Sequence, residues 1–426
     1  MSDSSDWSDR SDLSDLSDNI KSNNMKKAIL SITAAILPLT AAAQDITGIL
    51  QSIERNNKEL QAAKKSGEAQ MLELKEQNTL DDTSIEYSPF FKSGASGVAS
   101  SELVVKQGFD FPTLYASRSK AEKRQQAVTD LKWFTVRRDV LATAKALCLD
   151  LILINQERAL LDKRRDNAAR LLSMAEKRLS HGDGTILDVN KVKMERMNIE
   201  TEVLANTAAR NTALEALRAI NGNIPLAVDM TEYPSTAASQ PSSAASHPSS
   251  VIDYQTLLNN AIAAELTLRT ADAEVAASQQ DVKVNRMGLL PKLEIGYRRN
   301  TDGSEASNGF MVGASLPLFS GKSKIKTAKA RLEETTLNLD NTRIQTESRI
   351  RSLISELQQT RTAADVYDTA LLHTTLDLLY KAVEGGEITI MEYYVEADAI
   401  YKNLQAHLQL ENQCQKILAE ITKNEL

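Results

Sequence analysis

The chain has 426 residues, of which 25% are charged and only 4% aromatic, with 16 Gly and 9 Pro. This composition favours a helical protein over an all-β fold, and the length suffices for two structural modules. The formal net charge is −7, but residues 1–24 contribute −4 of it, since they hold six Asp against Arg10 and Lys21. The remaining charge of about −3 gives no electrostatic support for nucleic-acid binding.

Two segments precede the predicted fold. Residues 1–24 repeat Ser-Asp with almost no apolar side chain, which predicts a disordered N-terminal extension. Residues 25–43 start with Met-Lys-Lys, continue through a short apolar run and end in three Ala. This pattern is typical of a secretory signal peptide rather than of a buried N-terminal helix. We therefore predict that translation starts at Met25 and that the mature protein starts at Gln44.

The pattern of residues 44–228 predicts a first structural repeat. Segments in which apolar residues have helical spacing follow, or are followed by, segments in which apolar and polar residues alternate. The predicted elements in chain order are a helix over Asp45–Leu80, strands over Thr83–Phe91 and Glu102–Pro112, a long helix over Thr113–Ser180 and a returning helix over Ile186–Ile220.

Residues 229–250 are rich in Ser, Pro and Ala and predict a linker. Residues 251–426 then predict a second structural repeat with the same order of elements. These are a helix over Ile252–Met287, strands over Pro291–Arg299 and Gly309–Phe319, a polar loop between them over Asn300–Asn308, a long helix over Lys322–Glu384 and a returning helix over Ile388–Thr422.

Apolar residues recur at alternating steps of three and four along both long helices, which predicts antiparallel coiled-coil hairpins. The first series, which only Arg158 and Arg165 interrupt, is Val140, Ala144, Leu147, Leu151, Ile154, Leu161, Ala168, Leu172, Ala175 and Leu179. The second is Ile350, Leu353, Leu357, Thr360, Ala364, Tyr367, Leu371, Thr374 and Leu378. The turns that end these helices also correspond, since Gly182 and Gly386 are each followed six positions later by an acid. The fold class is therefore mainly α with a small β part, built from a duplicated unit.

The four predicted strands alternate apolar and polar residues and are about nine to eleven residues long, the length of a tilted transmembrane β-strand. Four strands cannot close a barrel, and an open edge in lipid would leave backbone groups unsatisfied. A barrel would therefore need several chains. The pattern alone leaves open a soluble coiled-coil protein whose two hairpins pack on its helices.

The twice-repeated order of helix, two strands, helix, turn and helix resembles the TolC family of outer membrane efflux proteins. The resemblance covers about Asp45–Leu426 and includes KQGFDFPTLYASR and GASLPLFSGKSKIKTAKARL at the strand-to-helix junctions. It implies a homotrimer in the outer membrane that extends into the periplasm, with a twelve-stranded barrel and a twelve-helix tunnel. It also implies three partners: outer membrane lipid, a periplasmic adaptor (membrane fusion) protein and an inner-membrane transporter.

The acids after the two turns have two interpretations. Asp188 and Glu392 complete Thr-x-x-acid capping boxes and would then only start the next helix. In a trimer, each acid would instead occur three times and form a ring that repels anions at the closed end of a tunnel. Glu396, one helical turn after Glu392, would extend that ring. The resemblance favours Glu392, because family acids near this position in the second repeat line the periplasmic aperture.

Arg178-Leu179-Ser180 resembles the tip segment that contacts the adaptor in this family, and Gly182 and Gly386 form the two tips. The alternative is an ordinary last helical turn in which the helix dipole favours a cation.

No catalytic constellation occurs. The four His are scattered without metal-ligand spacing, and there is no Gly-rich phosphate loop or nucleophile elbow. We therefore predict no enzyme, no cofactor and no metal. The predicted function is an outer membrane channel for efflux or secretion, a passive conduit that opens at its periplasmic tip. The alternative from another class is a soluble periplasmic coiled-coil adaptor or scaffold.

Overall fold

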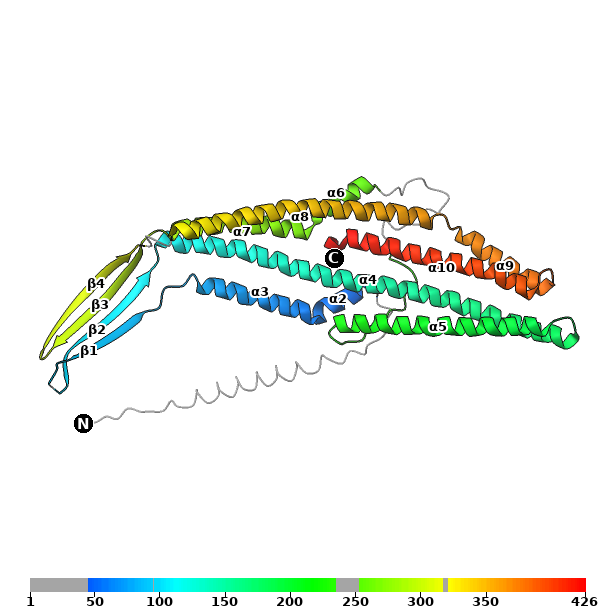
Figure 1. Cartoon of the computed structure of the whole chain (residues 1–426), viewed down its shortest axis with the longest axis horizontal. Helices are drawn as coiled ribbons and strands as arrows, with labels where there is room; N and C mark the ends of the chain where they lie inside the picture. The colour runs from blue at the N-terminus through cyan, green and yellow to red at the C-terminus, as the bar shows by residue number, and fades with distance from the viewer. Residues whose placement is uncertain (1–44, 95, 235–252, 317–320) are drawn as a thin grey trace, which may run out of the picture. The chain divides into compact units, whose positions relative to one another are not determined.

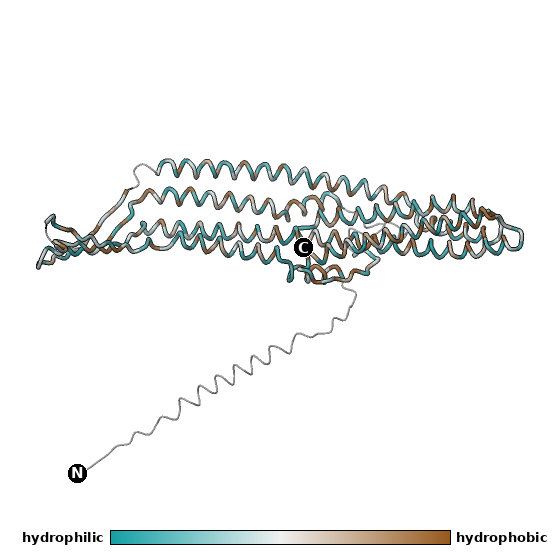
Figure 2. The backbone as a smooth tube through the Cα atoms, turned by 60° about the horizontal axis from the view of Figure 1, so that its bottom comes forward, coloured by the Kyte–Doolittle hydropathy of each residue, from teal (hydrophilic) through white to brown (hydrophobic). Residues whose placement is uncertain are grey.

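A computed structural model describes residues 45–94, 96–234, 253–316 and 321–426 of the chain. The predicted N-terminal extension and signal peptide lie outside these residues, as does most of the predicted linker. Asp45–Leu426 form one structural unit, to which all the described elements belong. Among the described residues, no helix is both long enough and apolar enough to cross a membrane. Figure 2 shows hydrophobic and hydrophilic residues interspersed along the helices and strands.

The described elements follow the predicted order. The first set is α2 (Ile46–Asn56), α3 (Lys58–Glu76), β1 (Ser84–Phe91), β2 (Val98–Phe109), α4 (Pro112–His181) and α5 (Ile186–Ile220). The second is α6 (Tyr254–Ala264), α7 (Leu266–Met287), β3 (Lys292–Asp302), β4 (Glu305–Ser315), α8 (Gly321–Ala364), α9 (Thr369–Gly385) and α10 (Ile390–Ile421). A 3₁₀ turn over Lys423–Glu425 follows. The mainly helical fold with a small four-stranded sheet is thus confirmed.

Helix α4 is the longest element, with 70 residues, and would extend over about 105 Å at the usual helical rise. Pro112 opens it, because the first helical position needs no donated hydrogen bond. Seam residues predicted from the heptad pattern, among them Val140, Ala144 and Leu151, are buried against α2 and α5. The sheet lies at the start of α4 and a tight turn lies at its end (Figure 1).

The two short helical segments that precede the hairpins are each broken, so the single helices predicted over Asp45–Leu80 and Ile252–Met287 are wrong. Asn57 separates α2 from α3, and Glu265 separates α6 from α7, both with extended backbone. Each of these side chains caps the helix that follows it, a bond that favours starting a new helix there. Apolar periodicity runs across both breaks and therefore conceals them.

Glu265 is only 1% exposed and holds several elements together. Its carboxylate accepts hydrogen bonds from Arg138 of α4 at 2.8 Å and from Arg349 of α8 at 2.6 Å. Burial opposes the charged form of Glu265, but hydrogen bonds from Thr267 and the charges of Arg349 and Arg138 outweigh it and lower its pKa. A buried acid is retained here because two cations compensate it.

The long helix predicted over Lys322–Glu384 is also broken, between α8 and α9. Asp368 has extended backbone, and its side chain accepts a hydrogen bond from the Leu371 amide at 2.9 Å. The break changes which face of the helix is buried. Beyond it the predicted seam residues Leu371 and Leu378 are exposed, whereas Leu376 and Val383 are buried. The predicted seam is therefore correct in α8 and wrong in α9.

The four strands form one antiparallel sheet in the order β1-β2-β3-β4, which leaves β1 and β4 at its edges. The strands β3 and β4 have 11 residues each and continue to a turn at Gly303, so the polar loop predicted over residues 300–308 is wrong. The polar residues there belong to the two strands, which stay paired as far as Asp302 opposite Glu305.

The two faces of the sheet differ in polarity, because cross-strand partners lie on the same face. On one face Tyr297 of β3 lies between Val105 of β2 and Phe310 of β4. On the same face Ile295 lies opposite Val312. On this face Ile295, Phe310 and Val312 are exposed, with Phe310 at 93% and Val312 at 83%, whereas Val105 and Tyr297 are half-buried. The opposite face carries ion pairs between Lys106 and Glu86 at 3.0 Å, and between Arg298 and Glu102 at 2.8 Å.

Candidate functional site at the two helical turns

The first turn connects α4 to α5 through a glycine in left-handed conformation. Gly182 has φ of 84° and ends the helix. Its amide donates to the Leu179 carbonyl at 3.1 Å, and the Asp183 amide donates to the Arg178 carbonyl at 2.9 Å. This pair of bonds is a Schellman motif, which satisfies the carbonyls left free at a helix end.

The second turn connects α9 to α10 with the same geometry. Gly386 has φ of 76°; its amide donates to the Val383 carbonyl at 3.2 Å, and the Glu387 amide donates to the Ala382 carbonyl at 2.9 Å. Each of these residues lies 204 positions after its counterpart in the first turn. The two turns, which the sequence predicted from the spacing between glycine and acid, thus also share the same backbone hydrogen bonds.

Both predicted acids act as helix caps. Asp188 accepts a hydrogen bond from the Thr185 amide at 3.1 Å, while Glu392 accepts one from the Thr389 amide at 2.8 Å. The threonine oxygens in turn accept bonds from the Asp188 and Glu392 amides, which completes two capping boxes. The backbone and side-chain hydrogen bonds of Thr389 lower the pKa of Glu392, so this exposed acid is ionised at neutral pH. Glu396 is exposed one turn further along α10.

Arg178 joins the two turns. Its Nη2 donates a hydrogen bond of 2.7 Å to the Val383 carbonyl near the end of α9. The neighbouring Ser180 hydroxyl donates to the Lys177 carbonyl at 2.7 Å, within the same helix. Arg178 is therefore engaged inside the chain, whereas Leu179 is exposed.

The comparisons with known proteins agree with this arrangement. Residues 257–423, from α6 to the 3₁₀ turn, match the family model described as outer membrane efflux protein. The chain is thus similar to outer membrane efflux proteins over its second half. It is therefore an outer membrane efflux channel and neither an enzyme nor a soluble adaptor. No curated protein matches the chain in the sequence search.

Solved structures match the fold at low sequence identity. CusC, whose structures describe transmembrane channel formation, has a TM-score of 0.71 at 14% identity and covers 89% of this chain and 91% of its own. VceC, an outer membrane protein of Vibrio cholerae, has a TM-score of 0.69 at 13% identity, with coverage of 89% and 95%. The CmeC outer membrane channel of Campylobacter jejuni has a TM-score of 0.69 at 12% identity, with coverage of 89% and 85%.

A shared core joins the two hairpins of this efflux protein beneath the turns. Tyr393, Tyr394 and Tyr401 of α10 pack with Val189 and Val192 of α5. The rings of Tyr393 and Tyr394 meet edge to face with centroids 5.2 Å apart. Burial raises the pKa of the Tyr393 and Tyr394 hydroxyls well above the usual value, so both stay neutral. The sequence contained a signal for this core, because apolar and aromatic residues of α10 recur at steps of four and three, at Ile390, Tyr394, Ala397, Tyr401 and Leu404.

A charged group borders the same core and was missed from the sequence. Arg164 of α4 pairs with Glu195 and, at 3.0 Å, with Glu202, both on α5. Its guanidinium also lies 5.4 Å from the centre of the Tyr401 ring. The ion pairs of Arg164 thereby hold α4 to α5, and its cation–π contact with Tyr401 connects the first hairpin to the second. No local motif marks it, since its partners are more than 30 residues away.

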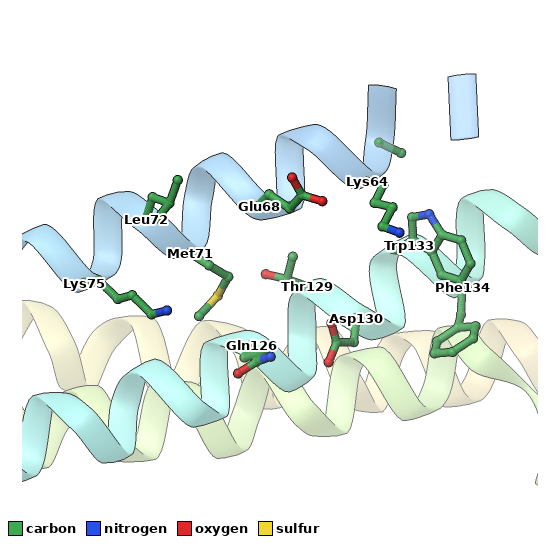
Figure 3. A pocket seen from close by; sticks show the side chains of 12 residues that line it. Lys64, Glu68, Met71, Leu72, Lys75, Gln126, Thr129, Asp130, Trp133 and Phe134 are labelled. Carbon is green, nitrogen blue, oxygen red and sulfur yellow. The ribbon is translucent and has the colours of Figure 1, made fainter. Parts of the chain in front are cut away.

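One pocket of the described residues lies away from the two turns. A groove of about 720 Å³ lies between α3 and α4 and includes Met71, Thr129 and Trp133 (Figure 3). Its charged side chains are Lys64, Glu68 and Lys75 of α3 and Asp130 of α4. The described residues also contain no group of three or more His, Cys, Asp or Glu placed to hold a metal ion.

Proposed function

We propose that three copies of the chain assemble into one channel, with the sheets completing a twelve-stranded barrel and the helices a tunnel. The observation that carries this proposal is the sheet itself. It has two unpaired edges, β1 and β4, and one exposed apolar face. Edges of this kind cannot remain open in lipid, and pairing β4 of one copy with β1 of the next would remove them. The opposite face, with its ion pairs, would line the lumen.

The experiment that tests the assembly is cross-linking between the sheet edges. Cysteines placed at Tyr87 in β1 and Phe310 in β4 should form disulfide-linked trimers in the outer membrane. A matched pair at Leu204 of α5 and Leu337 of α8, far from both edges, should not link. A monomer of unchanged mass from the edge variant would contradict the assembly.

The channel is a passive conduit that opens at its turns, which lie at the periplasmic end. Glu392, Glu396 and Asp188, each present three times, would form rings of negative charge that attract cations there. The lowered pKa of Glu392 supports this role, because its charge persists in mildly acidic solution. Replacing Glu392 and Glu396 with Ala should reduce cation preference in single-channel recordings. Unchanged preference would refute the role of these acids.

The tips also serve to dock a periplasmic adaptor protein, which connects the channel to an inner-membrane transporter. Exposed apolar side chains at the first turn support this role, because Leu179, Ile186 and Leu187 are exposed beside Ser180 and Gly182. Gly386 would present the second turn to the same adaptor, and Arg178 would hold the two turns at a fixed spacing.

The docking proposal has a direct test. Leu179→Asp should abolish recovery of the adaptor after cross-linking in cells while the trimer persists. Leu204→Asp is the matched control, since Leu204 is an exposed leucine of α5 distant from the turn. Equal recovery from both variants would remove the first turn from the docking surface.

We also infer that residues 44–228 and 251–426 are repeats of one ancestral unit, joined by the linker at 229–250. The matched Schellman motifs and capping boxes at the two turns support this inference. Separate expression of either half should give no stable protein, because the core under the turns takes side chains from both.

A further inference from the structure

A dense group of cations begins helix α8. We call Lys322, Lys324, Lys326, Lys329 and Arg331 the basic patch. All five are exposed, and no acid occurs between Gly321 and Leu332. None of the five forms an ion pair with another residue of the part of the chain that the structure describes. The patch therefore presents five uncompensated positive charges over three turns of helix.

Helix stability does not account for the basic patch. The N-terminal end of an α-helix carries a partial positive charge, so cations in the first turns are unfavourable and acids are preferred there. At the other strand-to-helix junction the first cation of α4, Arg118, pairs with Asp110 at 2.7 Å. The cations of α8 are therefore free to bind an external anionic partner.

The position of the patch indicates which partner that is. Strand β4 ends at Ser315, and its apolar side chains Phe310 and Val312 are almost fully exposed. The five residues between Ser315 and Gly321 limit the gap between strand and helix to about 20 Å, even when fully extended. The patch thus begins where the apolar face of the sheet ends.

Further cations lie on the neighbouring helices at the end of the helical part that is next to the sheet. Lys120, Lys123 and Arg124 are exposed on the first turns of α4, and Arg286 is exposed at the end of α7, which packs against α8. The nearest acids of α8, Glu333 and Glu334, come only after the patch. A segment rich in Lys and Arg directly beside a membrane-entering element attracts anionic lipid headgroups.

We propose that the basic patch binds the phosphate groups of anionic phospholipids in the leaflet on the tunnel side of the membrane. This proposal rests on the proposed function, since that function places the sheet in lipid and α8 below it. The flexible lysine stems allow each ammonium group to reach a phosphate while the helix axis stays outside the apolar layer. The interaction fixes how deep the sheet sits in the membrane.

The test measures lipid preference of the full trimer. The protein is reconstituted in phosphatidylcholine vesicles that contain spin-labelled phosphatidylglycerol or spin-labelled phosphatidylcholine, and the immobilised fraction of each label is compared. At low salt the wild type should favour the anionic label by about tenfold, since each cation near the surface contributes to the attraction. Raising the ionic strength should abolish the preference.

Three variants separate the outcomes. Replacing all five patch residues with Gln should abolish the preference, whereas Lys322→Arg, Lys324→Arg, Lys326→Arg and Lys329→Arg together should retain it. The matched control replaces Lys163, Arg170, Lys177, Arg196 and Lys381, exposed cations of the hairpin halves, with Gln and should also retain it. A preference that survives the patch variant, or that falls equally in the control, overturns the proposal. Loss of the trimer or of conductance in the wild type would instead refute the proposed function.

Discussion

The two turns share one backbone design but differ in what covers them. Leu179 and Val383 occupy the same position of the two Schellman motifs, yet Leu179 is 37% exposed and Val383 is fully buried. Ile186 and Ile390 both start the following helix, and they are 56% and 3% exposed. The second turn is therefore supported by a core within the chain, whereas apolar side chains of the first turn are exposed. Two turns with the same backbone hydrogen bonds thus differ in how much of their apolar surface the chain itself covers.

The largest effect is expected from the core of the second turn. Tyr393→Ala should lower the free energy of unfolding by about 3–5 kcal/mol, because it empties a site that is almost fully enclosed. Leu187→Ala at the first turn should change it by less than about 0.5 kcal/mol, since Leu187 is exposed. Chemical denaturation of the purified protein measures both. Similar losses in the two variants would show that the turns do not differ in support.

The bond between the turns should have the next largest effect. Arg178→Ala removes the donor to the Val383 carbonyl and should cost about 1.5–3 kcal/mol, the range for hydrogen bonds to charged groups. Hydrogen exchange at the Gly386 and Glu387 amides should accelerate as the second turn loosens. Lys177→Ala, at the exposed preceding residue, serves as the control and should leave exchange unchanged. Unaltered exchange in both variants would mean that the turns are independent.

Removing the N-cap side chain should cost the same stability at both turns, in contrast to the unequal losses of the first prediction. Thr185→Ala and Thr389→Ala should each cost about 1 kcal/mol, because each removes the N-cap side chain of one capping box. Helix stability near each turn, followed by hydrogen exchange, measures the change. A much larger loss at Thr389 would indicate that the tyrosine core, rather than local capping, determines the stability of that cap.

The smallest effect concerns pH. The pKa of Glu392 is lowered in the folded state, so its contribution to stability is present above the unfolded value near 4.5 and is lost as the pH falls through the folded value. Glu392→Gln should therefore flatten the acid side of the stability profile slightly. Titration of unfolding below about pH 5 in both proteins measures the difference. An identical slope in the two proteins would show that the carboxylate is not bonded as described.

Predictions from the sequence succeeded where the determining contacts are local. The capping boxes follow from threonine and an acid three positions apart, and the helix ends follow from Gly182 and Gly386. The alternation of apolar and polar residues likewise predicted a sheet with two unlike faces. The breaks at Asn57, Glu265 and Asp368 were missed, because apolar periodicity continues across them while a single side chain starts a new helix.

By itself, the sequence determined the order of elements, the two turns and the caps, since these depend on residues within a few positions of one another. Only the tertiary structure decided which turn is buried. Val383 is covered because the break at Asp368 reorients α9 toward α10 and the first hairpin. It also decided that Arg178 reaches Val383, a residue 205 positions away. Burial and long-range hydrogen bonds depend on which faces of distant helices meet, and no local pattern encodes that.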